Sequence, residues 1–175
     1  MQQQQQQLNS NHNQQTWQGV TCSQTPQVCS SQTCHITQIE LTSYGLSGSI
    51  PADIRNLSLL ELLRLDDNEL IGPIPREVGQ LTALQQLILY LYINQLTGSI
   101  PVEVGQLTAL EILYLYSNQL TGTIPVEVGH LTALELLSLR SNELTGTIPV
   151  EVGQLTALRL LYLYSNQLTG TIPVE

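Results

Sequence analysis

The sequence predicts an α/β solenoid in which one structural unit is stacked along the chain. The leucines that open successive copies of one segment lie 24, 26, 24 and 24 residues apart, at Leu57, Leu81, Leu107, Leu131 and Leu155. Each copy also carries the pattern L-x-x-L-x-L-x-x-N-x-L-x-G-x-I-P. A fixed period of about 20–29 residues indicates stacked repeats that share one core. The 175 residues, 42% of them hydrophobic, suffice for one such domain.

The repeat resembles the leucine-rich repeat, and its ending resembles the plant-type, extracellular class. The residues that carry the resemblance are, in one copy, Leu110, Leu113, Leu115, Asn118, Leu120, Gly122, Ile124 and Pro125, followed by V-E-V-G-H-L. The resemblance covers about four-fifths of the chain and implies a horseshoe of about six repeats. It also implies a parallel sheet on the concave face and short helical or 3-10 turns on the convex face.

The chain before the repeats divides into two segments. Residues 1–15 are rich in Gln and Asn, so we expect a disordered leader that cannot bury enough apolar surface to order itself. Residues 16–35 contain Trp17, Gly19, Val20 and Cys22, which resemble the N-terminal cap of plant-type repeat proteins. That family usually has a cysteine two residues before the tryptophan, where this chain has Gln15. The cap is therefore expected, but its disulfide pattern is open.

The three cysteines lie together just ahead of the first repeat. They are Cys22, Cys29 and Cys34, and any two of them can form a disulfide as far as the sequence shows. A disulfide would place the protein in an oxidising compartment. A zinc site that uses His35 is the competing interpretation, although the spacing fits no common zinc finger.

The repeat domain is predicted to run over residues 36–175, with an asparagine near the end of each strand. This column comprises Asn68, Asn94, Asn118, Asn142 and Asn166, while the first repeat has Tyr44 at the same position. An inward asparagine can hydrogen-bond the backbone groups of its own turn and of the neighbouring turn. We therefore expect the column to be structural.

The third repeat contains two additional residues. Residues 87–94 read L-I-L-Y-L-Y-I-N, against L-Y-L-Y-S-N at 113–118. Because a strand has a period of two, this insertion leaves the leucines facing inward. We expect a lengthened strand or a bulge here that adds an aromatic side chain to the concave face.

The two ends of the sequence carry no export signal and no C-terminal cap. After Met1 comes a glutamine tract without an apolar region, and the last repeat stops at Glu175. We expect an extracellular or cell-surface protein whose sequence here is either a fragment or begins at a misplaced start. Self-association through an uncapped end is a further expectation.

Several classes of function are disfavoured. A net charge of −9, with five Arg and no Lys, disfavours nucleic acid as a partner. The sequence contains no run of 18 apolar residues, so it predicts no membrane span. The histidines His12, His35 and His130 lie apart, and no phosphate-binding glycine loop or metal-ligand cluster occurs. We expect a protein that is not an enzyme and needs no cofactor or metal.

The concave face is predicted to bind a protein or peptide. Residues between the inward leucines point outward and form columns, in which we place Ile88 beside Tyr114 and Tyr90 beside Tyr116. Tyrosine suits protein recognition because it offers a rigid contact area with a polar tip. The predicted ligand-binding residues are Ile88, Tyr90, Tyr92, Tyr114, Tyr116, Arg140, Tyr162 and Tyr164. The resemblance implies a receptor-like protein or a secreted inhibitor.

A second outward set supplies an alternative function. It consists of Thr97 and Ser99, Thr121 and Thr123, Thr145 and Thr147, and Thr169 and Thr171. Spacings of about 4.8 Å between strands and about 6.6 Å along a strand would arrange these hydroxyls as a flat grid. Such a grid resembles the ice-binding surfaces of solenoid antifreeze proteins. Separately, the sequence N-L-S makes Asn56 the predicted glycosylation site of a secreted chain.

Overall fold

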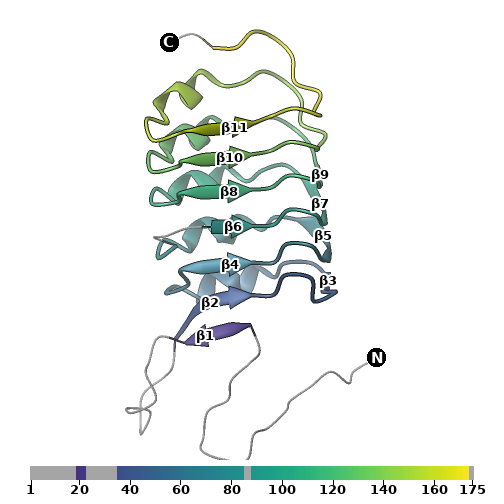
Figure 1. The fold of residues 1–175 in the computed structure, drawn as a ribbon, viewed down its shortest axis with the longest axis vertical. Helices are drawn as coiled ribbons and strands as arrows, with labels where there is room; N and C mark the ends of the chain where they lie inside the picture. Colours follow the sequence, from purple (N-terminus) through teal and green to yellow (C-terminus); the bar gives the residue numbers. More distant parts are fainter. Residues whose placement is uncertain (1–18, 23–34, 85–87, 174–175) are drawn as a thin grey trace, which may run out of the picture.

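In the part of the chain that the structure describes, six parallel strands, one per repeat, form a sheet along one side of the molecule (Figure 1). The computed structural model describes residues 19–22, 35–84 and 88–173. The parallel strands are β2 (Ile36–Glu40), β4 (Leu62–Arg64), β6 (Ile88–Tyr90), β8 (Ile112–Tyr114), β10 (Leu136–Ser138) and β11 (Leu160–Tyr162). At the N-terminal end, β1 (Val20–Cys22) pairs antiparallel with β2. The predicted solenoid of about six repeats is confirmed.

A second ladder of short strands runs beside the main sheet, along the L-T-G segments. It comprises β3 (Ser47–Gly48), β5 (Glu69–Pro73), β7 (Gln95–Gly98) and β9 (Gln119–Leu120). The parallel bonding continues beyond β9, since the Thr145 N–H donates to the Gly122 carbonyl at 2.8 Å and the Thr169 N–H to that of Gly146 at 2.7 Å. Gly122 has a φ of 77°, a conformation that favours glycine. The threonine positions therefore lie on a regular backbone ladder.

Among the described residues, five 3-10 turns cover the side of the solenoid opposite the main sheet (Figure 1). They are η1 (Ala52–Asn56), η2 (Arg76–Gln80), η3 (Val102–Gln106), η4 (Val126–His130) and η5 (Val150–Gln154). A proline precedes each turn with extended backbone, which suits a residue without an N–H. The turns pack closely: a Cβ added to Gly129 would lie 2.6 Å from the carbonyl oxygen of Glu151. The predicted convex-face turns are thus confirmed as 3-10 helices.

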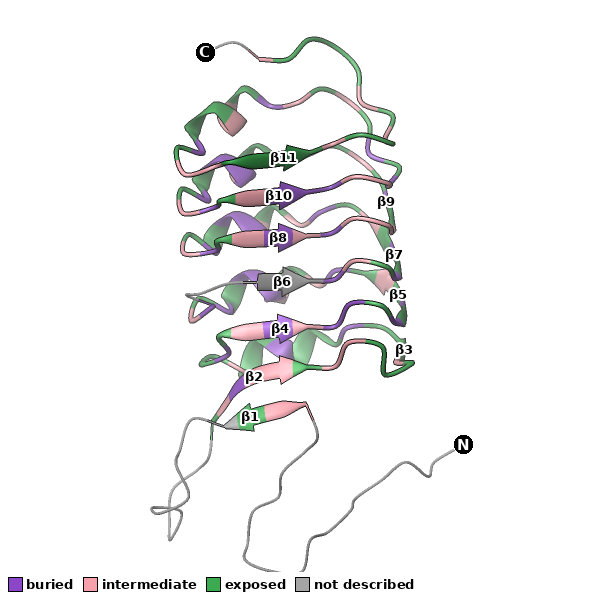
Figure 2. Cartoon of the chain, in the orientation of Figure 1, coloured by how far each residue is buried: buried purple, intermediate pink, exposed green. Residues whose placement is uncertain are grey.

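The core lies between the sheet and the turns, where Figure 2 shows the buried positions. The two inward leucines of the fourth repeat, Leu113 and Leu115, are both 0% exposed. The equivalent leucines Leu63, Leu65, Leu91, Leu137 and Leu139 belong to the same core, together with Val104, Val128 and the isoleucine of the I-P turn. Burying this column continuously supplies the main favourable free energy of folding, since each repeat alone would leave its apolar face in water.

The asparagine column has the structural role that the sequence predicts. The Oδ1 of Asn142 accepts the Leu120 N–H of the preceding repeat at 3.1 Å. Its amide nitrogen donates to the carbonyls of Leu115 at 2.9 Å and Leu139 at 3.0 Å. The same pattern occurs at Asn68, Asn94, Asn118 and Asn166. Each asparagine therefore joins two consecutive repeats.

The predicted bulge or strand insertion between Ile88 and Asn94 is wrong. β6 pairs with β8 in a constant register, and Asn94 makes the bond to the preceding repeat that Asn118 makes one repeat later. The two extra residues therefore precede Ile88, since three residues separate Leu84 from Ile88 but one separates Leu110 from Ile112. The part of the predicted strand at Leu87 lies outside the described residues. The physical reason is the asparagine column, because the bonds of Asn94 fix the register at the other end of the strand.

Several predictions about the ends fall outside the described residues. These are the leader at 1–15, the cap residue Trp17, and any cysteine pairing that involves Cys29 or Cys34. The division into leader, cap and repeat domain stays a prediction. In the part of the chain that the structure describes, no helix is long and apolar enough to cross a membrane.

Candidate functional site

The register of the main sheet fixes which outward residues are neighbours. Arg64 pairs with Tyr90, Tyr90 with Tyr114, and Ser138 with both Tyr114 and Tyr162. This corrects two sequence predictions, because Tyr90 lies beside Tyr114 and not Tyr116. For the same reason Ile88 lies beside Ile112 and not Tyr114. Both errors follow from placing the insertion within the strand. The solvent side of this sheet is called the concave face below.

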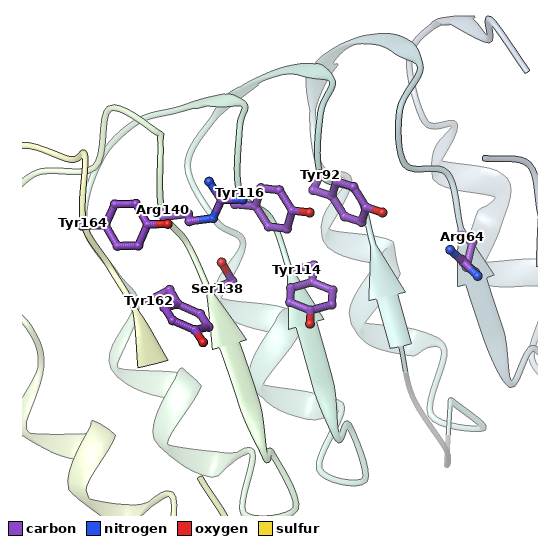
Figure 3. A pocket seen from close by; sticks show the side chains of 8 residues that line it. All are labelled: Arg64, Tyr92, Tyr114, Tyr116, Ser138, Arg140, Tyr162 and Tyr164. Atoms are coloured by element: carbon purple, nitrogen blue, oxygen red, sulfur yellow. The ribbon is translucent and has the colours of Figure 1, made fainter. Parts of the chain in front are cut away.

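A hollow of about 480 Å³ lies on the concave face across the second to sixth repeats (Figure 3). Its lining residues are Arg64, Tyr92, Tyr114, Tyr116, Ser138, Arg140, Tyr162 and Tyr164. Six of the eight are predicted ligand-binding residues, so the structure brings these six together. Ile88 and Tyr90 take register positions on the same face, and their contact with a ligand stays a prediction. Arg64 and Ser138 are additional to the predicted set.

One column of the hollow forms a continuous stack across four repeats. The rings of Tyr92 and Tyr116 are stacked, with centroids 4.4 Å apart and planes 10° from parallel. The guanidinium carbon of Arg140 lies 4.1 Å from the Tyr116 ring centroid and 5.7 Å from that of Tyr164. Aromatic and cation–π contacts of this kind hold flat side chains in place.

The next column packs edge-on against this stack. Tyr114 meets Tyr116 at 5.6 Å and 86°, and Tyr162 meets Tyr164 at 6.4 Å and 85°. Burial raises the pKa of Tyr114, and the charges of the neighbouring Tyr116 and Tyr162 phenolates would raise it further. The ring contacts therefore hold the tyrosines of both columns in fixed relative orientations.

A buried carboxylate anchors the N-terminal end of the stack. Asp66 is 0% exposed and accepts a hydrogen bond from the Thr42 hydroxyl at 3.1 Å. Arg64 Nε lies 3.6 Å from Asp66 Oδ1, and Arg64 Nη1 lies 3.8 Å from Glu40 Oε2. The pKa of Tyr92 is raised, first by burial and then by the hydrogen bond that its hydroxyl donates to Asp66. This network fixes the Tyr92 ring that begins the stack.

An aliphatic row borders the hollow on the concave face. Ile112, Leu136 and Leu160 are register partners on consecutive strands. With Glu135 and Arg159, which form an ion pair at 3.7 Å, they line a second hollow of about 430 Å³. Sequence reasoning missed this row. The signal was available, since each member directly precedes an inward leucine and must point outward.

The threonine rows lie on a separate surface, along the second ladder. All eight predicted positions, from Thr97 to Thr171, are exposed. The rows begin after the second repeat, where Ile71 and Pro73 occupy the equivalent positions. The structure therefore presents a hydroxyl grid over four repeats.

The remaining candidates lie away from the concave face. Asn56 ends η1 and is exposed, as is Ser58 of the same sequon. His130 is exposed at the end of η4. Within residues 19–22, 35–84 and 88–173, no group of three or more His, Cys, Asp or Glu side chains could hold a metal ion.

The family follows from two comparisons. The leucine-rich repeat family model matches residues 108–168. The leucine-rich repeat ectodomain of the receptor kinase SOBIR1 from Arabidopsis thaliana superimposes with a TM-score of 0.77 at 30% identity, over 89% of this chain and 84% of that one. The chain belongs to the plant-type leucine-rich repeat family.

A curated relative matches a shorter part of this leucine-rich repeat chain. A probable receptor-like serine/threonine-protein kinase of Arabidopsis thaliana is 43% identical over 70 residues, which are 40% of this chain and 6% of the kinase. The chain thus spans a small part of that relative, and the match lies in the repeats.

Two further solved structures are similar to this leucine-rich repeat chain. The Arabidopsis receptor kinase HAESA, in complex with the peptide hormone IDA and the co-receptor SERK1, has a TM-score of 0.74 at 36% identity, over 78% of this chain and 23% of that one. A plant ice-binding protein has a TM-score of 0.76 at 34% identity, over 90% of this chain and 48% of that one.

Proposed function

We propose that this leucine-rich repeat chain is a non-catalytic binding module that recognises a protein or peptide on the concave face. The observation that carries the proposal is the hollow lined by five tyrosines and Arg140. Tyrosine and arginine are enriched among residues that dominate binding energy, and their fixed orientations reduce the entropy lost on binding. The HAESA complex supports the choice of ligand, because that relative was solved with a peptide hormone.

The proposed setting is extracellular or at the cell surface, as in a receptor-like protein or a secreted inhibitor. The receptor ectodomains among the neighbours support it. In that setting Asn56 would carry a glycan, since both it and Ser58 are exposed on the side away from the hollow. Intact-mass measurement of the secreted protein before and after glycosidase treatment tests this; an unmodified Asn56 would contradict it.

The binding proposal is tested with peptides selected against the protein from a random linear library. Replacing Tyr114, Tyr116, Tyr162 and Tyr164 with Ala should abolish binding of the selected peptides, measured by calorimetry. Tyr44→Ala is the matched control, because Tyr44 is exposed and lies outside the hollow. Circular dichroism should show that both variants fold. Equal affinity of the quadruple variant and the unmodified protein would refute the proposal.

Ice binding through the threonine rows is a second candidate. The exposed grid on the second ladder and the similarity to a plant ice-binding protein favour it. It predicts that the protein shapes growing ice crystals and that Thr123→Lys with Thr147→Lys stops the shaping, while the tyrosine variant retains it. Round, unshaped crystals with the unmodified protein would eliminate this candidate.

A further inference from the structure

One arginine on the concave face differs from the other four. Arg55, Arg64, Arg76 and Arg159 each form an ion pair with an aspartate or glutamate. Arg140 forms none with any described residue, although the chain contains 14 acidic residues. None of the eight residues that line its hollow is acidic. On a chain of net charge −9, this uncompensated guanidinium is held in place by tyrosine rings.

A second unsatisfied polar group lies in the same hollow. Ser138 is 1% exposed, and its Oγ has no hydrogen-bond partner among the described residues. Figure 3 shows this side chain between Tyr114 and Tyr162, near Arg140. Leaving a buried hydroxyl without a partner costs free energy that a ligand atom could recover. Ser138 and Arg140 are two residues apart on β10 and its continuation, so both point to the same side.

We propose that Ser138 and Arg140 form a subsite for the carboxylate of an aspartate or glutamate side chain in the ligand. The guanidinium supplies charge-assisted donors, and the serine hydroxyl supplies one more. Leu136, the preceding outward residue of β10, belongs to the aliphatic row. The ligand segment that fits therefore carries an acidic side chain close in sequence to an aliphatic one. This inference rests on the proposed peptide-binding function.

The test uses linear peptides selected from a random library. Each peptide is fused to the display protein through its C-terminus, so that only side chains can supply a carboxylate. Selected peptides should be enriched in acidic residues. In an amidated synthetic copy of one such peptide, replacing the acidic residue with its amide should weaken binding about tenfold or more. In the Arg140→Gln variant the same replacement should change affinity less than about twofold.

Arg55→Gln is the matched control, because Arg55 lies in η1 outside the hollow and already has an acidic partner, Asp53. It should leave the discrimination between acid and amide intact. Discrimination that persists in Arg140→Gln, selected peptides without acidic residues, or binding that requires a free C-terminus would each overturn the subsite. If the carboxylate subsite is overturned but the selected peptides still need the concave-face tyrosines for binding, the proposed binding function stands without the subsite. If no selected peptide depends on those tyrosines, both proposals fail.

Discussion

Replacing Asn142 with alanine should show how much the asparagine column contributes to stability. The side chain is 8% exposed and joins two repeats through one accepted and two short donated hydrogen bonds. A third donated bond, to the Arg140 carbonyl, is 3.3 Å long. Alanine removes all of these hydrogen bonds and has no polar side-chain atom that could replace them. The Leu120 N–H would then lose its partner inside the core, whereas the Leu115 and Leu139 carbonyls would each keep a bond from the asparagine of a neighbouring repeat.

The expected loss follows mainly from the Leu120 N–H. A buried polar group left without a partner costs about 1–3 kcal/mol, so we expect a loss of about 2 kcal/mol in the free energy of unfolding. For a domain of this size that corresponds to a fall of about 4–8 °C in Tm. Asn142→Asp should destabilise at least as much at neutral pH, because its buried carboxylate can accept the Leu120 N–H but places a second oxygen against the Leu115 and Leu139 carbonyls.

Urea denaturation followed by circular dichroism measures the effect. Gln119→Ala is the control, because this amide is exposed on the same stretch of chain and should cost less than about 0.5 kcal/mol. A loss below about 1 kcal/mol in Asn142→Ala, or one equal to that of the control, would refute the assigned role.

Three further substitutions probe close packing, backbone strain and ionisation. Gly129→Ala should lower the free energy of unfolding by more than about 2 kcal/mol in the same denaturation assay, because the alanine Cβ would lie 2.6 Å from the Glu151 carbonyl oxygen. Gly153→Ala is the control and should be nearly neutral, because the space around Gly153 is open. Ile93→Asn should stabilise by about 1 kcal/mol, because Ile93 has a φ of 50° that strains a β-branched residue; destabilisation would contradict this. Folding raises the Tyr92 pKa, so its contribution is complete below the unfolded value of about 10 and is lost as pH rises above it. The stability advantage over Tyr92→Phe should therefore shrink above pH 10 in urea titrations at several pH values, and a constant difference would contradict the raised pKa.

Much of the fold could be predicted because one short sequence pattern recurs in each repeat and predicts the same structural unit each time. The inward leucines and the asparagine column each have a single structural interpretation, and Asn142 makes the bonds predicted for it. The insertion in the third repeat was placed wrongly because two added residues keep the inward leucines in phase whether they follow Ile88 or precede it. The hydrogen bonds of Asn94 decide between them, and they depend on the neighbouring repeat.

The sequence predicts which side chains of the site point outward, because this follows from alternation along a strand. It does not predict the contacts that these side chains make with neighbouring repeats. Tyr114 and Tyr116 point outward because of their position beside Leu115, which the sequence shows directly. The missing partner of Arg140 and the buried hydroxyl of Ser138 depend on contacts between repeats. No spacing within one repeat reveals such contacts.

Nuclear magnetic resonance titration of the isotope-labelled protein with a selected peptide tests most directly whether the concave face binds the ligand. The amide signals of Tyr114, Ser138 and Tyr162 should shift as the peptide is added, because these residues lie on the strands beneath the hollow. Those of Val126 and Val150, in the turns on the opposite side, should not move. Shifts confined to the turns or to the threonine rows, with Tyr114, Ser138 and Tyr162 unchanged, would contradict binding at the concave face.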